Sequence, residues 1–175
     1  MREGVAEDRV TLRRSLSLRY RGQAHELDID YRTSVGYYAQ EHESIKRGVT
    51  VLEHMKEVSG APDLTLRNVL GHFLLADKIE QDAGTLSGGE KTKLALARLV
   101  IGEHNLLLLD EPTNNLDPQA RDALLEALEQ YTGSLVLVSH DSDFVEQLAP
   151  DRVILMPEGD TSYFDDSMLD LVALA

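Results

Sequence analysis

Two short segments constrain the fold of this chain more than any other feature of the sequence. Residues 86–91 (LSGGEK) place a serine and two glycines at the start of a helical pattern. Residues 106–112 (LLLLDEP) form a continuous apolar run, typical of a buried parallel strand, that ends in two adjacent carboxylates. Ligands of open α/β sheets bind beyond the carboxyl ends of the strands, and helix N-termini attract phosphate. Together the segments predict the catalytic half of a nucleotide-hydrolysing site.

The composition excludes several other classes of function. The chain has 175 residues, enough for one domain with a substantial core, and no cysteine that could form a disulfide or a thiolate metal site. Its net charge of −14 disfavours contact with a nucleic-acid backbone, so we expect no direct DNA binding. The apolar runs are too short for a membrane span, and residues 1–30 lack the apolar core of a signal peptide. We therefore expect a cytoplasmic protein.

Alternating strand and helix patterns predict an α/β fold with a parallel sheet. We expect residues 1–33 to form a separate β-hairpin segment and residues 34–175 an α/β domain with a small helical subdomain at about 41–85. Two predicted strands, residues 15–20 and 25–31, flank a turn at 21–23, and a short strand follows at 35–40. In the rest of the chain the predicted strands are a buried strand at 106–109, a second buried strand at 135–139 and a third strand at 152–156. The predicted helices are 49–58, 64–75, 90–101 capped by Ser87 or its neighbour, 118–131, 141–148 and a tail at 168–175.

Four polar side chains are predicted at the carboxyl ends of these strands. Asp110 is a candidate Mg²⁺ ligand, because Mg²⁺ bound with phosphates takes one or two carboxylates. Glu111 can orient or deprotonate an attacking water. His140 can hydrogen-bond a terminal phosphate, and Gln40 can contact Mg²⁺ or a water. The alternative for Asp110 and Glu111 is an N-cap and an exposed strand end, which the following Pro-Thr-Asn-Asn-Leu-Asp disfavours.

A second candidate site lies at Ser87, Gly88 and Gly89. The first amides of a helix have no internal partner, and glycine lets a phosphate approach the backbone closely. Ser-Gly-Gly alone is also a common loop. Its position before a helix and ahead of the carboxylate strand favours phosphate binding.

Taken together, these motifs resemble the ATP-binding cassette (ABC) ATPases. Gln40 corresponds to the Q-loop glutamine, residues 86–91 to the signature motif, residues 106–111 to the Walker B strand, residues 114–117 to the D-loop and His140 to the switch histidine. The segments VGYYAQEH (35–42), LSGGEKTKLALA (86–97) and DEPTNNLD (110–117) further resemble the second cassette of ABC-F proteins, soluble tandem-cassette ATPases that act on the ribosome. Asn115 and Ser142-Asp143 depart from that subfamily's usual histidine and Arg-Tyr.

The resemblance implies a mechanism in which two cassettes enclose two ATP molecules. Ser87, Gly88 and Gly89 would contact the γ-phosphate of ATP held by a partner cassette, and Asp117 would lie at the interface between the two sites. The residues that would serve ATP and Mg²⁺ on this chain's own cassette are Gln40, Asp110, Glu111 and His140. The implied fold is a partial P-loop NTPase. The implied partners are ATP, a second P-loop-bearing cassette and the ribosome.

One family motif does not occur in this sequence. A P-loop reads G-x-x-x-x-G-K-[ST], and none of the twelve glycines is followed by lysine. Family members carry it before the Q-loop strand, where this chain has 39 residues ahead of Gln40. Without P-loop contacts to the phosphates, we expect the chain alone to hydrolyse ATP little above background. Residues 12–30 resemble a short stretch of the hydantoinase/oxoprolinase A family, which predicts a truncated or fused cassette with a junction near Thr33 or Ser34. Alternatively, residues 1–33 are a divergent hairpin of the cassette itself.

Three other functions are compatible with the sequence. The chain can be a non-catalytic partner that supplies the signature motif in trans to a complete cassette. It can be the ATP-binding subunit of a membrane transporter, although no span is visible. It can also be a gene remnant, in which case the sheet would expose apolar edges and be marginally stable.

Overall fold

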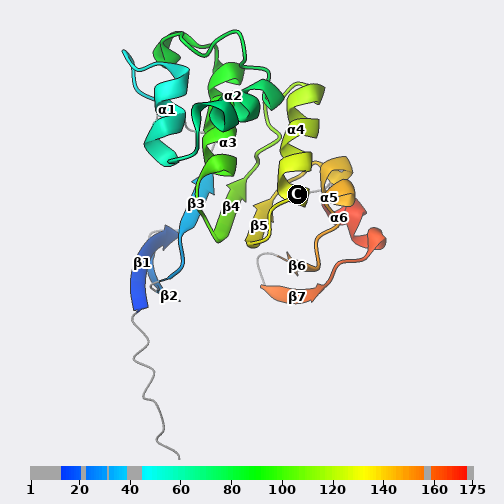
Figure 1. Cartoon of the computed structure of the whole chain (residues 1–175). Coiled ribbons are helices and arrows are strands. Elements are labelled where there is room, and N and C mark those ends of the chain that lie inside the picture. The colour runs from blue at the N-terminus through cyan, green and yellow to red at the C-terminus, as the bar shows by residue number, and fades with distance from the viewer. Residues whose placement is uncertain (1–12, 21–22, 31, 39–44, 156–158, 173–175) are drawn as a thin grey trace, which may run out of the picture. The chain divides into compact units, whose positions relative to one another are not determined.

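A computed structural model describes residues 13–20, 23–30, 32–38, 45–155 and 159–172 (Figure 1). It divides into two compact units, Met1–Ser34 and Val35–Ala175. The strands are β1 (Arg13–Tyr20), β2 (Gln23–Asp30), β3 (Val35–Tyr38), β4 (Leu106–Asp110), β5 (Ser134–Val138), β6 (Arg152–Leu155) and β7 (Asp160–Tyr163). The helices are α1 (Val51–Val58), α2 (Asp63–His72), α3 (Gly88–Ile101), α4 (Pro118–Glu129), α5 (Ser142–Leu148) and α6 (Leu169–Val172), with 3-10 turns η1 (Ala83–Thr85) and η2 (Asp166–Met168).

The first unit contains the predicted hairpin. β1 and β2 pair antiparallel over their whole length, with Tyr20 opposite Gln23. The turn is shorter than predicted, because Gln23 already belongs to β2. Tyr31, the predicted end of the second strand, lies outside the described residues.

The second unit contains a parallel sheet in the order β3-β4-β5, so the predicted α/β class is confirmed. Its register places Gly36 of β3, Leu107 of β4 and Leu135 of β5 in one row across the sheet. Tyr38, Leu109 and Leu137 form a second row on the same face. Leu107, Leu109 and Tyr38 are buried in the main core, together with apolar residues of α1, α2, α3 and α4.

Close contact between α3 and β3 requires the glycine at position 36. A Cβ atom at Gly36 would lie 2.7 Å from Leu99 Cδ1 of α3, 2.8 Å from Leu107 Cδ2 and 2.6 Å from His104 Cδ2. These contacts are shorter than packed side chains tolerate. The absence of a side chain at Gly36 therefore sets the distance between the sheet and the helix that follows Ser87.

Two of the predicted helices form as α1 and α2, with sharper ends than the apolar spacing indicated. α1 begins after Thr50, whose hydroxyl accepts from the Glu53 amide while the Glu53 carboxylate accepts from the Thr50 amide. This reciprocal capping box stabilises the helix start. α2 ends at His72 and not at Leu75, because Leu74 adopts a left-handed backbone with φ of 59°.

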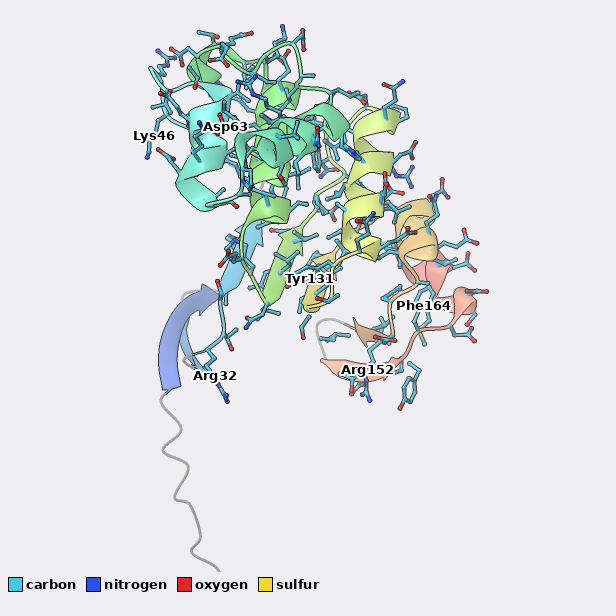
Figure 2. All side chains as sticks on the ribbon, in the orientation of Figure 1. Arg32, Lys46, Asp63, Tyr131, Arg152 and Phe164 are labelled. Carbon is cyan, nitrogen blue, oxygen red and sulfur yellow. The ribbon has the colours of Figure 1, made fainter. Side chains whose placement is uncertain are left out.

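Two predicted strands form but differ from expectation, one in its pairing and the other in its burial. Residues 152–156 were expected to add a third strand to the α/β pattern, but β6 pairs antiparallel with β7 in a separate two-stranded sheet. Arg152 is labelled on β6 in Figure 2. Its guanidinium lies over the ring of Tyr163 of β7, 4.9 Å from the ring centroid, and joins the two strands. The strand predicted at 135–139 forms at Ser134–Val138 and was expected to be buried, yet Val136 and Val138 are 44% and 56% exposed. Among the described helices, none has the length and apolar character that a bilayer crossing requires.

Candidate functional site

The carboxyl edge of the parallel sheet carries the acidic pair and the histidine predicted from the sequence. β4 ends at Asp110, which lies opposite Val138, the last residue of β5. Glu111 directly follows β4, and His140 follows β5 by two residues. Parallel strands end on the same side of a sheet, so these side chains reach the same edge although they are 29 residues apart.

Glu111 is held in an unusual backbone conformation. Its φ angle is 49°, in the left-handed region that non-glycine residues adopt at a cost of about 1–2 kcal/mol. Its amide donates to the Val138 carbonyl at 2.9 Å, and its own carbonyl accepts from the Asn114 amide at 3.2 Å. These bonds turn the chain sharply after β4. The turn aims the Glu111 side chain across the end of β5.

The Glu111 carboxylate contacts His140 directly. Oε2 of Glu111 lies 2.8 Å from Nδ1 of His140, and the His140 amide donates to the same oxygen at 3.5 Å. The hydrogen bond to Glu111, followed by the negative charge of that carboxylate, raises the pKa of His140 above its usual value. The Glu111 side chain is 20% exposed and that of His140 is 55% exposed. The pair is therefore open to solvent on the histidine side, where a phosphate can approach.

Ser87, Gly88 and Gly89 lie at the start of α3, as predicted. Ser87 is the N-cap: its hydroxyl accepts from the Glu90 amide at 3.3 Å, and its amide and hydroxyl donate to Glu90 Oε2, each at 2.8 Å. The two bonds from Ser87, its amide first, lower the pKa of Glu90. A Cβ atom at Gly88 would meet no atom within 4 Å. The backbone of Gly88 is therefore accessible to a ligand, while Ser87 is engaged with Glu90.

The loop after β4 packs on the start of α3. Asn115 has a φ of 64°, and its carbonyl oxygen lies 3.5 Å from the position of a Cβ at Gly89. Asp117 caps α4 by accepting from the Ala120 amide at 3.0 Å and also forms an ion pair with Lys93 of α3. The hydrogen bond from Lys93, reinforced by the cap, lowers the pKa of Asp117. The segments at residues 86–91 and 114–117 therefore adjoin each other within this chain.

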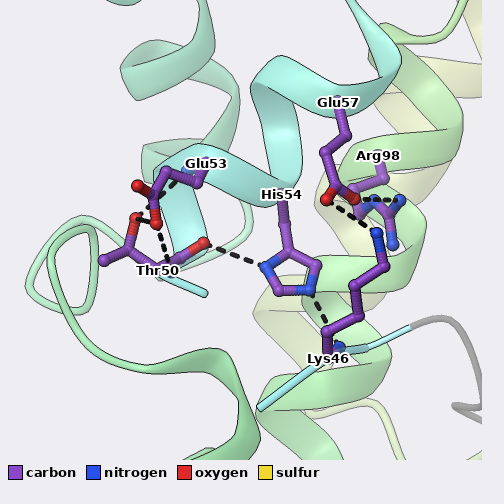
Figure 3. Close-up of polar contacts among 6 residues, drawn as sticks. All are labelled: Lys46, Thr50, Glu53, His54, Glu57 and Arg98. Atoms are coloured by element: carbon purple, nitrogen blue, oxygen red, sulfur yellow. Dashed lines mark hydrogen bonds and ion pairs between the residues drawn. The ribbon is translucent and has the colours of Figure 1, made fainter. Parts of the chain in front are cut away.

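Gln40 lies outside the described residues, but Lys46 and α1 contact each other and α3 through polar side chains (Figure 3). His54 of α1 is fully buried, accepts the Lys46 amide at Nε2 over 3.0 Å, and contacts the Thr50 carbonyl through Nδ1 over 3.0 Å. Since a carbonyl can only accept, Nδ1 carries the proton. Glu57 pairs with Lys46 at 2.8 Å and with Arg98 of α3 at 3.5 Å. These contacts connect Lys46 and α1 to the helix that begins after Ser87.

The acidic residues at the edge of the sheet suit a metal ion that takes most of its ligands from phosphate and water. They do not suit a metal ion that is held by protein side chains alone. Within the described ranges, no group of three or more histidine or acidic side chains can hold a metal ion. Asp110 is exposed at the strand end and forms no hydrogen bond or ion pair with another described side chain. One free carboxylate suffices for Mg²⁺ that takes its other ligands from phosphates and water. Asp110 would hold such an ion.

The structure brings together only part of the predicted site. Glu111 and His140 are in contact, and Gly89 adjoins the loop that contains Asp117. No hydrogen bond or ion pair joins Ser87, Gly88 or Gly89 to Glu111 or His140 in the described part of the chain. Sequence reasoning missed Lys93, because its partner Asp117 is distant along the chain, and His54, because its nearby partners Lys46 and Thr50 form no recognisable motif. The cap formed by Asp141, which accepts from the Phe144 amide at 3.0 Å, was detectable as an Asp before a helical pattern.

The model of the family described as ABC transporter matches residues 9–114, a range that includes both strands of the hairpin. The chain is 41% identical over 128 residues to the probable ATP-binding protein YbiT of Escherichia coli O157:H7, covering 71% of this chain and 24% of that protein. It is 47% identical over 112 residues to the probable ATP-binding protein YheS of Haemophilus influenzae, covering 61% and 17%. It is 30% identical over 169 residues to the uncharacterized ABC transporter ATP-binding protein YfmR of Bacillus subtilis, covering 93% and 27%. The chain spans about a quarter or less of the length of these relatives.

Solved structures share the fold of this chain. An ATP-binding subunit of an ABC transporter superposes with a TM-score of 0.66 and 24% identity, covering 81% of this chain and 63% of that one. The RNase-L Inhibitor superposes with a TM-score of 0.62 and 23% identity, covering 79% and 28%. At these identities the likeness establishes the architecture alone.

Proposed function

Because the chain belongs to the ABC transporter family, as an ATP-binding domain of that family, we propose that it is the catalytic part of an ATP-hydrolysing cassette. The observation that carries this proposal is the 2.8 Å contact between Glu111 and His140 at the carboxyl edge of the sheet. A carboxylate in contact with an imidazole beside a strand end is suited to position a water for attack on a phosphate.

Each residue of the edge has a role in the proposed reaction. Glu111 orients the attacking water and accepts its proton, while His140 donates a hydrogen bond to the terminal phosphate. Asp110 and Gln40 hold Mg²⁺, which supplies charge neutralisation at the phosphates when bound. Ser87, Gly88 and Gly89 contact the γ-phosphate of ATP held by a second cassette. Asp117 lies at the interface between the two cassettes, and its ion pair with Lys93 links this interface to α3.

The ABC-F assignment and the ribosome as a partner are part of this proposal. They rest on the motifs at residues 35–42, 86–97 and 110–117, and the names of YbiT and YheS agree with ATP as the ligand. The cytoplasmic location remains a prediction from the sequence.

The hairpin of residues 1–33 is proposed to belong to the cassette. The family match begins at residue 9, and the similarity to YfmR extends over 93% of the chain. Two points stay predictions: the resemblance of residues 12–30 to the hydantoinase/oxoprolinase A family, and a junction near Thr33 or Ser34.

The second candidate function is donation of Ser87–Gly89 in trans to a complete cassette. The open space beside Gly88 favours it, because a phosphate from outside the chain can reach this backbone. In this case the partner would supply its own catalytic carboxylate, and Glu111 would not be needed for turnover.

Calorimetric titration of Mg²⁺-ATP into the 175-residue chain is the first test. We expect no measurable binding, since no P-loop motif occurs in this sequence. Micromolar affinity of the chain alone would contradict the predicted dependence on a P-loop.

Hydrolysis in a mixture with a P-loop-bearing cassette then separates the two functions. Loss of stimulated turnover by about 100-fold or more in Glu111→Gln supports the catalytic cassette, because general-base catalysis contributes at least that factor. Turnover that survives Glu111→Gln but is lost in Gly88→Val supports donation in trans. Glu103→Gln, at an exposed site before β4, is the matched control for removing one carboxylate.

A further inference from the structure

A cavity of about 460 Å³ opens between α2, α3 and α4 in the second unit. It lies toward the amino ends of the parallel strands, because its lining includes His104, just before β4, and Thr132, just before β5. Glu111 and His140 follow the opposite ends of the same two strands. Small-molecule sites occupy about 300–1,000 Å³. The cavity therefore has the size of a ligand site and is separate from the edge that carries the catalytic candidates.

The deepest part of this cavity is apolar. Phe73, Leu107 and Leu128 line it, and each is at most 5% exposed. Val69 of α2 and Val100 of α3 are partly buried and extend the apolar lining toward the opening. A ligand with an apolar body would remove this surface from water together with its own.

Rings contribute part of the lining. Tyr131 follows α4, and its hydroxyl donates to the His104 carbonyl at 3.2 Å, which ties the end of α4 to the loop before β4. The rings of Phe73 and His72 lie on the α2 side of the cavity. Aromatic rings favour contact with other aromatic rings, and the face of a tyrosine or phenylalanine ring attracts cations. The lining therefore suits an aromatic ligand that carries a positive charge.

The fixed charges around the cavity also favour a cation. Among the described residues that line it, Glu126 of α4 is the only carboxylate, and none is a lysine or an arginine. Val100 and Ala127 lie in the last turns of α3 and α4, and no described backbone amide donates to either carbonyl. A helix C-terminus carries partial negative charge, because its last carbonyls have no partner within the helix. Two such ends and one carboxylate therefore border the cavity.

We propose that this cavity binds a small organic cation in which a short chain joins an ammonium group to an aromatic ring. The ring lies against Phe73, Leu107 and Leu128. The ammonium group lies beside Glu126 and the carboxyl ends of α3 and α4. This inference is independent of the proposed function, because no residue of the carboxyl edge takes part in it.

The probe is tryptamine, an indole with an ammonium group on a two-carbon chain, titrated into the 175-residue chain by calorimetry. We expect saturable binding with a Kd of about 1 mM or tighter, as small ligands reach in such pockets. Tryptophol, which has a hydroxyl in place of the ammonium group, should bind about threefold more weakly, since an exposed charge pair contributes little more than that. Indole-3-propionate, which carries a carboxylate, should bind more weakly than tryptophol.

Two variants test the charge and the space separately. Glu126→Gln should weaken tryptamine binding about threefold and leave tryptophol binding unchanged. Glu129→Gln is the matched control, because Glu129 is exposed on the same helix and does not line the cavity. Asn68→Trp places a large ring in the cavity and should weaken binding of both probes at least about tenfold. Asn68 is exposed on α2, so this variant should fold, and circular dichroism checks that it does.

NMR spectra locate the bound probe. Tryptamine should shift the amide signals of Val100, Gly102 and Ala127 and leave those of Glu111 and His140 in place. The reverse pattern would overturn the proposal, as would full affinity in Asn68→Trp, because binding would then occur elsewhere. Equal affinities for all three indoles would also overturn it, since an apolar surface alone would account for them. So would the absence of tryptamine binding to the native chain.

Discussion

Nδ1 of His140 lies 2.8 Å from Oε2 of Glu111, and this contact joins the ends of two neighbouring parallel strands. The carboxylate stabilises the protonated imidazole and raises the pKa of His140. A raised native pKa means that the contribution to stability is complete below the unfolded value of about 6.5 and disappears as pH rises through the native pKa. Since His140 is more than half exposed, solvent screens the pair and the contribution is small.

Glu111→Gln should therefore lower the midpoint of the His140 titration. The measurement is the pH dependence of the His140 ring signals in NMR spectra, compared with those of the native chain. Glu103→Gln removes a carboxylate elsewhere on the surface and should leave the midpoint unchanged. An unchanged midpoint in Glu111→Gln would show that the pair does not persist in solution.

Ser87 should stabilise α3 independently of any nucleotide. Ser87→Ala removes the hydroxyl that caps the Glu90 amide, and we expect a loss of about 1 kcal/mol in the free energy of unfolding. Ser87→Asn retains an N-cap side chain and should stay within a few tenths of a kcal/mol of the native value. Urea denaturation followed by circular dichroism measures both. Equal losses in the two variants would contradict the capping role.

The pair between Lys93 and Asp117 should couple α3 to the start of α4. Asp117→Asn keeps the helix cap but removes the charge opposite Lys93, whose side chain is only 12% exposed. A double-mutant cycle with Lys93→Met should yield a coupling energy of about 1 kcal/mol, limited by the exposure of Asp117. Because the pKa of Asp117 is lowered, this coupling is present above pH of about 4 and disappears as pH falls through the native pKa. Coupling that persists at low pH would exclude an ionic origin.

Gly36 should be required for packing of α3 on β3. Gly36→Ala introduces a methyl group within 3 Å of Leu99 and Leu107, and overpacking of this kind costs about 1–3 kcal/mol. Gly71→Ala is the matched control on α2, because a Cβ there meets nothing within 4 Å and alanine favours a helix. Thermal unfolding should place the midpoint of Gly36→Ala below that of the native chain and that of Gly71→Ala at or above it. A reversed order would show that the α3–β3 contact is looser than described.

Local sequence was sufficient to predict the helices, the strands other than β7, and the composition of the edge. The start of α3 follows from Ser87 and Glu90 three residues apart, and that of α4 from Asp117 and Pro118, because capping depends on neighbours in the chain. The apolar run before Asp110 similarly predicted a strand ending in carboxylates. These signals require no knowledge of the rest of the fold.

Tertiary structure alone decided which elements became neighbours and how much of each element is buried. β6 matched the pattern of a further parallel strand, but it pairs antiparallel with β7. Val136 and Val138 are as apolar as a buried strand and are nevertheless exposed, because burial depends on what packs against a residue. The pairing of Lys93 with Asp117 and the contact of Glu111 with His140 likewise arise from chain crossings, since residues far apart in sequence meet only once the sheet has formed.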